Sequence, residues 1–184
     1  MRALITGGTS GIGYCIAEEL IKKGYDVMIV SRKEGDLPKL REKYKDANIE
    51  FASYNLIQEE ECFRLLEDTK EIDFDLFVNN AGFGDIGRIT KTDIRKEIDM
   101  VKLNDIATLI LVKEFLKRFI AKDKGRVLTV ASAAAFAVAP YMNVYYASKS
   151  FVYSLAHGYH RELKDMKSKV TISVLCPGPV KTRF

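Results

Sequence analysis

A tyrosine and a lysine four positions apart form the pair with the clearest chemical use in this sequence. Tyr145 and Lys149 stand near the start of a segment with helical periodicity, so their side chains lie on one face, about one turn from each other. A phenol is a poor proton carrier at neutral pH, but a neighbouring ammonium favours its ionised form. The pair therefore predicts general acid or base chemistry by Tyr145. A solvated pair on a helix surface is the alternative.

A glycine-rich turn stands near the start of the chain. An apolar run that ends at Thr6 leads directly into Gly7-Gly8-Thr9-Ser10-Gly11-Ile12-Gly13, where an amphipathic helical pattern begins. Glycine lets backbone N–H groups approach phosphate oxygens, and a helix N-terminus adds unpaired donors and the positive end of its dipole. The turn therefore predicts a dinucleotide site, with Gly13 allowing helix and strand to pack closely. The predicted cofactor-binding residues are Gly7, Thr9, Ser10, Gly11, Ile12 and Gly13. A tight loop without a ligand is the alternative.

The end of the second apolar run indicates which dinucleotide is preferred. In dinucleotide-binding folds, an acidic residue here accepts hydrogen bonds from the adenosine ribose and marks a preference for NAD. This sequence has Ser31-Arg32-Lys33 instead, and Arg32 can pair with a phosphate through two hydrogen bonds. We therefore predict that NADP(H) is preferred over NAD(H), with Ser31 and Arg32 at the cofactor. The alternative is that Arg32 and Lys33 form a solvated loop pair.

The elements that must position these residues follow an alternating pattern. Short β-branched or apolar runs alternate with longer helical patterns, which is typical of a parallel sheet covered on both faces. We therefore expect a single α/β domain over 1–184, a Rossmann-type doubly wound parallel sheet of six strands with helices on both faces. The predicted strands are 2–6, 25–31, 49–53, 74–79, 126–131 and 170–175. The predicted helices are 11–23, 37–45, 58–71, 96–121 and 143–167.

Composition argues against several other classes of protein. The 29 Lys and Arg against 25 Asp and Glu are spread without a basic block, which gives little support to nucleic-acid binding. No apolar run suits a membrane span or a signal peptide, so we expect a cytoplasmic protein that binds no membrane. Three scattered cysteines without a histidine cluster predict neither disulfides nor a metal site. We expect Cys15, Cys62 and Cys176 each to be a buried, reduced thiol.

Taken in order, the motifs resemble those of the short-chain dehydrogenase/reductase family. They are the glycine turn at 6–13, Asn79-Asn80-Ala81-Gly82 after the fourth apolar run, Asn104, Ser132, Tyr145 with Lys149, and Pro177-Gly178-Pro179-Val180. Order and spacing match from residue 2 to 182. The resemblance implies an NADP(H)-dependent oxidoreductase that transfers a hydride between the nicotinamide and a small carbonyl or secondary alcohol substrate. It also implies a homodimer or homotetramer.

The resemblance assigns a role to each motif. It implies that Ser132 hydrogen-bonds the substrate carbonyl, that Tyr145 exchanges a proton with its oxygen, and that Lys149 holds the nicotinamide ribose. Asn104 would position a water in a proton relay to Lys149, and would otherwise be a polar residue on a solvent face. Asn79 and Asn80 would brace the central strands. Further cofactor contacts are implied at Asn55, Leu56, Asn80, Ala81, Gly82, Tyr145, Lys149, Pro177, Gly178, Val180 and Thr182.

The sequence departs from the family pattern in two places. Asn55-Leu56 replaces the Asp-Val or Asp-Leu pair that meets the adenine in many members, although Asn55 can still accept a hydrogen bond. The chain stops at Phe184, where the family usually continues with a substrate-covering helical segment and a seventh strand. We therefore expect a C-terminally truncated chain without a substrate lid, whose strand at 170–175 presents an apolar edge to water.

Two other functions stay open at this point. The missing lid is compatible with a cofactor-binding redox sensor or scaffold that has little or no turnover. A flavin or nucleotide-sugar enzyme on the same fold fits the glycine turn, but it leaves Ser132, Tyr145 and Lys149 without a shared purpose.

Overall fold

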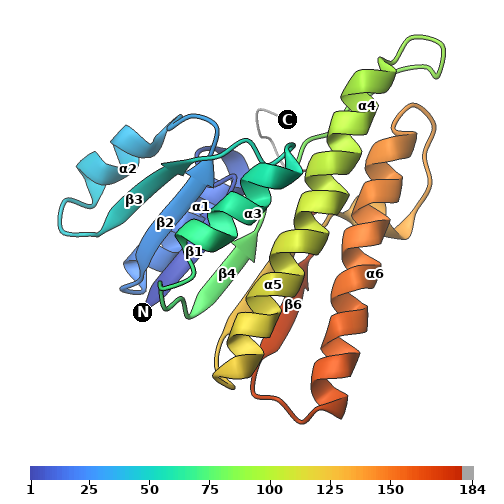
Figure 1. The fold of residues 1–184 in the computed structure, drawn as a ribbon. Helices are drawn as coiled ribbons and strands as arrows, with labels where there is room; N and C mark the ends of the chain where they lie inside the picture. The colour runs from blue at the N-terminus through green and yellow to red at the C-terminus, as the bar shows by residue number, and fades with distance from the viewer. Residues whose placement is uncertain (180–184) are drawn as a thin grey trace.

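Six strands form one parallel sheet in the computed structural model, which describes residues 1–179 (Figure 1). Their order across the sheet is β3-β2-β1-β4-β5-β6, and all five neighbouring pairs run parallel. The chain order reverses between β1 and β4, where sheets of this kind bind ligands. The predicted fold is confirmed, each strand lying within two residues of its predicted limits. The strands are β1 (Arg2–Thr6), β2 (Asp26–Ser31), β3 (Ile49–Ser53), β4 (Leu76–Asn79), β5 (Arg126–Val130) and β6 (Thr171–Leu175).

Helices cover both faces of the sheet (Figure 1). On one face, α1 (Gly11–Lys22) and α2 (Leu37–Lys43) pack on Ile5, Ile29 and Val78. On the other face, α3 (Glu59–Asp68), α5 (Thr108–Ala121) and α6 (Asn143–Asp165) pack on residues such as Leu4 and Phe77. Successive strand residues point to opposite faces, so the apolar runs of the sequence serve two cores at once.

The helix predicted over 96–121 begins two residues earlier and is not uniform. It consists of α4 (Ile94–Val101), a π-helical turn (Lys102–Ala107) and α5. Asp93 caps its start by accepting a hydrogen bond from the backbone N–H of Arg95 at 2.9 Å. π-helical turns inside α-helices are rare and frequently occur at functional sites. Asn104 lies in this one.

The edge strand β6 differs from the expectation of an apolar edge. Val170 and Ile172 are only 3% and 4% exposed because they point into the core beneath α6. Thr171 and Ser173, on the alternate positions, are the exposed side chains, and only Leu175 at the end of the strand is a large exposed hydrophobic. Buried apolar residues therefore alternate with exposed polar residues along this segment, so its exposed edge is mostly polar.

The prediction that all three cysteines are buried was wrong for Cys15. Cys62 is buried, but Cys15 is exposed and Cys176 is partly buried. The buried residues of α1 are Gly13, Ala17 and Ile21, which share one helix face that excludes Cys15. Within residues 1–179, no helix has the length and apolar character needed to cross a membrane.

Candidate active site

The glycine turn between β1 and α1 is tightly packed against the segment that follows β4. Gly7 and Gly11 have φ angles of +66° and +55°, which glycine adopts without strain. A Cβ on Gly13 would lie 2.4 Å from both Asn80 Nδ2 and the Gly7 carbonyl oxygen. The close packing predicted at Gly13 is therefore present, and its partner is the asparagine motif.

Thr6 and Asn80 lock the turn to β4 through neutral hydrogen bonds. Thr6 Oγ1 accepts from the backbone N–H groups of Asn80 and Ala81 at 3.0 and 3.1 Å. Asn80 Nδ2 donates to the carbonyl oxygens of Thr6 and Gly7, both at 3.0 Å. Asn80 thus braces two central strands, as expected. Asn79 does not, because its amide donates instead to Thr108 Oγ1 at 2.9 Å and ties β4 to α5.

The N-terminus of α1 is open toward a ligand. Ser10 occupies the cap position but its side chain makes no capping hydrogen bond, and the first turn, which begins with Gly11 and Ile12, contains no acidic residue. The backbone N–H groups at the start of α1 therefore keep their donors and their positive dipole end available for an anion. Beside them, Thr9 Oγ1 donates to Ser31 Oγ at 3.3 Å, which places the end of β2 against the turn.

The ends of β2 and β3 supply the other candidate nucleotide contacts. Arg32 is exposed and has no ion-pair partner among residues 1–179, while the nearby carboxylate of Glu34 pairs with Arg41 at 2.8 Å. Leu56 is buried. Asn55 Oδ1 is buried and, in the described part of the chain, accepts no hydrogen bond. Since unsatisfied buried acceptors are rare and costly, this oxygen fits a donor on a bound molecule, such as the amino group of an adenine.

Tyr145 and Lys149 lie one turn apart at the start of α6, as predicted. Lys149 is 6% exposed, its Nζ donates to the Val130 carbonyl at the end of β5 at 3.1 Å, and Nζ lies 5.8 Å from the centroid of the Tyr145 ring. Burial lowers the pKa of Lys149 to about 8, and the nearby charge of Asp105 opposes that shift. The alternative of a solvated surface pair is therefore wrong.

Ser132 follows β5 and caps a short 3-10 helix, Ala133–Phe136, that the sequence analysis did not predict. Its Oγ accepts from the backbone N–H of Ala134 at 3.1 Å, which leaves the hydroxyl proton for another acceptor. The Ala133 N–H donates to the Pro177 carbonyl at 2.9 Å, so the turn after β6, with Pro177 and Gly178, lies beside this loop. Val180 and Thr182 lie outside the described residues.

Asn104 is 1% exposed, so its alternative placement on a solvent face is wrong. Its Oδ1 accepts from the Phe83 N–H at 3.1 Å, and its Nδ2 donates to the Phe83 carbonyl at 2.9 Å and to Ser148 Oγ at 3.0 Å. It thereby joins the segment after β4 to α6. A Cβ on Gly82 would lie 2.9 Å from Asn104 Oδ1 and 3.4 Å from Lys149 Nζ, so Gly82 permits the close approach of these groups.

Sequence reasoning missed Asp105, which adjoins this cluster. Its carboxyl group is partly buried, its pKa is raised to about 6 by that burial, and the charge of Lys149 opposes the shift. A signal was available, since Asp105 is the only charged residue between Lys102 and Lys113 in an otherwise apolar stretch of helix.

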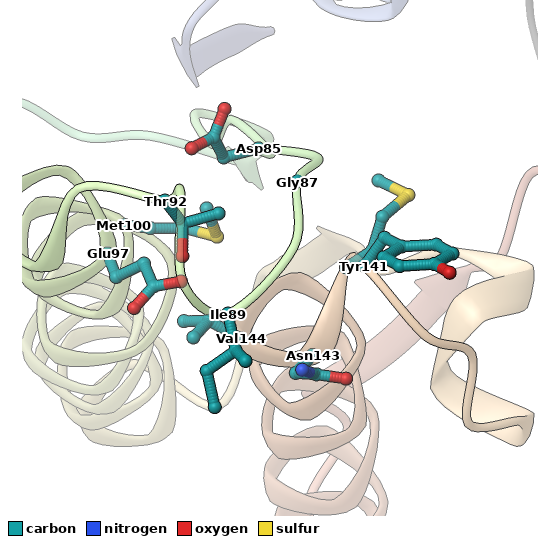
Figure 2. A pocket seen from close by; sticks show the side chains of 10 residues that line it. Asp85, Gly87, Ile89, Thr92, Glu97, Met100, Tyr141, Asn143 and Val144 are labelled. Atoms are coloured by element: carbon teal, nitrogen blue, oxygen red, sulfur yellow. The ribbon is translucent and has the colours of Figure 1, made fainter.

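A cavity of about 140 Å³ lies beside the first turn of α6, within two residues of Tyr145 (Figure 2). Figure 2 shows Ile89, on the loop that follows β4, beside Val144 of α6, with Asp85 and Gly87 on the same loop. Thr92, Glu97 and Met100 close another side. The Gly87 N–H donates to the Tyr141 carbonyl at 2.8 Å and so holds loop and helix together. The cavity therefore lies next to the segment of α6 that begins with Asn143 and continues to Tyr145.

The parallel sheet, the open glycine turn and the Tyr145–Lys149 pair define a dehydrogenase of the Rossmann type. Residues 1–184 match the model of the family described as short chain dehydrogenase. A 3-oxoacyl-[acyl-carrier-protein] reductase from Rickettsia prowazekii is 33% identical over 183 residues, which are 98% of this chain and 73% of that protein. The chain therefore belongs to the short-chain dehydrogenase/reductase family, whose members are oxidoreductases.

Solved structures of this family have the same fold. A short-chain dehydrogenase from Sphingobium yanoikuyae in complex with NADPH has a TM-score of 0.89 and 25% identity, covering 98% of this chain and 72% of that one. A short-chain dehydrogenase/reductase from Burkholderia phymatum in complex with NAD has the same TM-score and identity, covering 98% of this chain and 66% of that one. The chain thus spans about two thirds to three quarters of these relatives, and they include complexes with either nicotinamide cofactor.

Proposed function

We propose that the protein is an NADP(H)-dependent oxidoreductase that transfers a hydride between the nicotinamide and a small carbonyl or secondary alcohol. The observation that carries the proposal is the buried Lys149 ammonium beside Tyr145, at the end of the sheet where the glycine turn is open to a phosphate. Asn55 fits the adenine end of such a cofactor, and Gly82 permits the close approach of Asn104 and Lys149 near its other end. The bound dinucleotide would supply or accept the hydride.

The side chains around the substrate oxygen would handle the proton. During reduction this oxygen gains negative charge, and the Ser132 hydroxyl can donate to it because its own oxygen already accepts from the Ala134 N–H. Tyr145 would donate its phenolic proton to the same oxygen. Lys149 Nζ lies 5.8 Å from the centroid of the Tyr145 ring and would stabilise the phenolate that remains. Oxidation of an alcohol runs through the same groups in reverse.

Asn104 would support proton resupply through its backbone. Both amide hydrogens and the amide oxygen of its side chain are already hydrogen-bonded to Phe83 and Ser148. A relay water would therefore be held by backbone carbonyl groups of the π-helical turn, where the regular helical hydrogen-bonding pattern is interrupted.

Arg32 would select NADP(H) over NAD(H). Its guanidinium is exposed beside Ser31 and lacks an ion pair within the described chain, so it is available to a 2′-phosphate. Titrating NADPH and NADH separately into the protein tests this, with nicotinamide fluorescence as the readout. We expect NADPH to bind at least about tenfold more tightly, and Arg32→Glu to remove that advantage. Lys45→Glu makes the same charge change at an exposed distant position and is expected to leave selectivity unchanged.

Hydride transfer itself is tested with a panel of ketones and aldehydes, following NADPH oxidation. We expect turnover that falls by about 10²- to 10⁴-fold in Tyr145→Phe, because the proton donor to the substrate oxygen is lost. Tyr146→Phe changes the neighbouring phenol and should retain activity. Tight binding of NADPH without turnover of any carbonyl would instead favour a redox sensor or scaffold.

We also propose that the protein forms a homodimer or homotetramer. Ile94, Ile98 and Val101 of α4 are 65%, 46% and 38% exposed and lie along one helix stripe, next to α6 with the exposed Phe151. Light scattering of the wild type and of Ile98→Glu tests this. A smaller assembly in the variant is expected, and a monomeric wild type would contradict the proposal.

A further inference from the structure

The carboxyl group of Asp105 has no role in the steps above, although its placement is costly. It lies in the π-helical turn, directly after Asn104. Its Oδ1 is buried and accepts no hydrogen bond from residues 1–179. A buried carboxylate oxygen without a donor destabilises the folded state, because the desolvation of the charge is not offset by a hydrogen bond. An unsatisfied buried group of this kind therefore calls for an explanation, and buried ionisable groups with a specific charge partner are candidates for a functional role.

Lys149, in contrast, has more hydrogen-bond donors than it uses. An ammonium has three hydrogen-bond donors, and in the described chain Lys149 uses one of them on an oxygen acceptor, the Val130 carbonyl. The π-helical turn packs against α6, which brings the two unsatisfied groups to the same interior region. An unused acceptor and unused donors of opposite charge therefore lie in one buried region of the described chain.

The other ionisable groups near this site do not compete. Tyr145 is the further titratable group that α6 brings to Lys149. From α3, Cys62 is the buried titratable group, and burial raises its pKa to about 12, so it stays neutral. Lys102, in the same π-helical turn, is partly exposed. Burial is the main cause of both pKa shifts, and within residues 1–179 the charges of Asp105 and Lys149 each act on the pKa of the other.

We propose that Asp105 is a positioning residue for proton transfer, holding Lys149 as an ammonium beside Tyr145 in spite of its burial. The proposal rests on the proposed function, since the protonated Lys149 matters through the phenolate it stabilises. The pKa values of about 6 for Asp105 and about 8 for Lys149 place both groups in their charged forms between those limits. Without the carboxylate, burial would drive the pKa of Lys149 further down.

The charge coupling is tested without cofactor or substrate, by NMR titration of protein labelled with ¹³C at the ε-carbon of lysine. Lys149→Arg identifies the resonance by its loss. We expect Asp105→Asn to lower the midpoint of Lys149 by about one pH unit or more. Asp105→Glu should restore most of it. Glu114→Gln removes the same charge from α5, where the carboxylate pairs with Lys117, and should leave the midpoint in place. An unchanged midpoint in Asp105→Asn overturns the proposal.

The consequence for chemistry is tested by the pH profile of kcat/KM for carbonyl reduction. In Asp105→Asn the decline at alkaline pH should begin at lower pH, in step with the NMR midpoint, and Asp105→Glu should restore its position. If kcat/KM in Asp105→Asn falls by the same factor at every pH, Asp105 is merely structural and the positioning role is refuted. If Asp105→Asn shifts the NMR midpoint of Lys149 but the wild-type protein shows no turnover, the proposed function is refuted. The catalytic part of this inference then fails with it, while the charge pair stands.

Discussion

The glycine turn and the Lys149 cluster lie at the same edge of the sheet, yet they satisfy their polar groups in opposite ways. In the turn, Thr6 and Asn80 use neutral hydrogen bonds of 3.0 to 3.1 Å that leave neither side chain unpaired. In the cluster, Lys149 is buried with a lowered pKa and Asp105 has an oxygen without a donor. The turn is therefore built for rigidity, whereas the cluster keeps buried charges that reduce stability, as we expect of groups with the proposed catalytic role. Substitutions in the two regions should move stability in opposite directions.

Gly13→Val should have the largest effect, because a Cβ alone would already lie 2.4 Å from Asn80 Nδ2 and the Gly7 carbonyl oxygen. We expect a loss of at least about 3 kcal/mol in the free energy of unfolding, together with loss of nucleotide binding. Urea denaturation measures the first and NADPH fluorescence the second. Gly158→Ala, at an exposed position of α6 with no atom within 4 Å of the new Cβ, should instead stabilise by about 0.5 to 1 kcal/mol. Equal changes in the free energy of unfolding for Gly13→Val and Gly158→Ala would contradict the proposed rigidity of the turn.

Thr6→Val should have the next largest effect. The variant keeps the shape of the side chain but removes the acceptor for the backbone N–H groups of Asn80 and Ala81. Leaving two partly buried donors unpaired should lower the free energy of unfolding by about 2 to 3 kcal/mol. Thr6→Ser retains the hydroxyl and should lose much less. A Val variant as stable as the Ser variant would show that these hydrogen bonds do not hold the turn together.

Lys149→Met should show a smaller change of the opposite sign. The pKa of Lys149 in the folded protein is about 8, below its ordinary value of 10.5, so its charge destabilises the folded state below pH 8. That penalty is lost as the pH rises from 8 to 10.5, because the folded protein then releases a proton that the unfolded chain retains. Met alone would leave the Asp105 carboxylate buried without its counter-charge, so the variant also carries Asp105→Leu. We expect this double variant to be about 1 kcal/mol more stable at pH 7, with the gain shrinking toward pH 10. Urea denaturation at both pH values measures it, and destabilisation at pH 7 would contradict it.

The fold and most of the site were predictable because they depend on local patterns. Alternating apolar runs and helical segments determine a doubly wound sheet, and the ends of its parallel strands gather at one edge, where Asn80 and Ser132 lie just after β4 and β5 as predicted. The positive φ angles of Gly7 and Gly11 likewise suit the residue type that the turn requires.

The features that sequence reasoning missed depend on contacts between distant segments. The π-helical turn forms where Asn104 bonds to Phe83, 21 positions away, and to Ser148, 44 positions away, which no helical periodicity encodes. The same turn decides that Asp105 shares a buried region with Lys149. The exposure of Cys15 depends on which face of α1 meets the sheet. The polar edge of β6 depends on which alternate residues of the strand point into the core.

The strand order also has a consequence for the sequence of events during synthesis. Both neighbours of β1 in the sheet, β2 and β4, are complete by Asn79, and the hydrogen bonds that lock the glycine turn involve nothing beyond Ala81. Ribosomes extend chains at about 5 to 20 residues per second, and N-terminal units generally fold first. The glycine turn can therefore close several seconds before α6 has emerged, so β1, β2 and β4 can already be paired when the later strands and α6 are added.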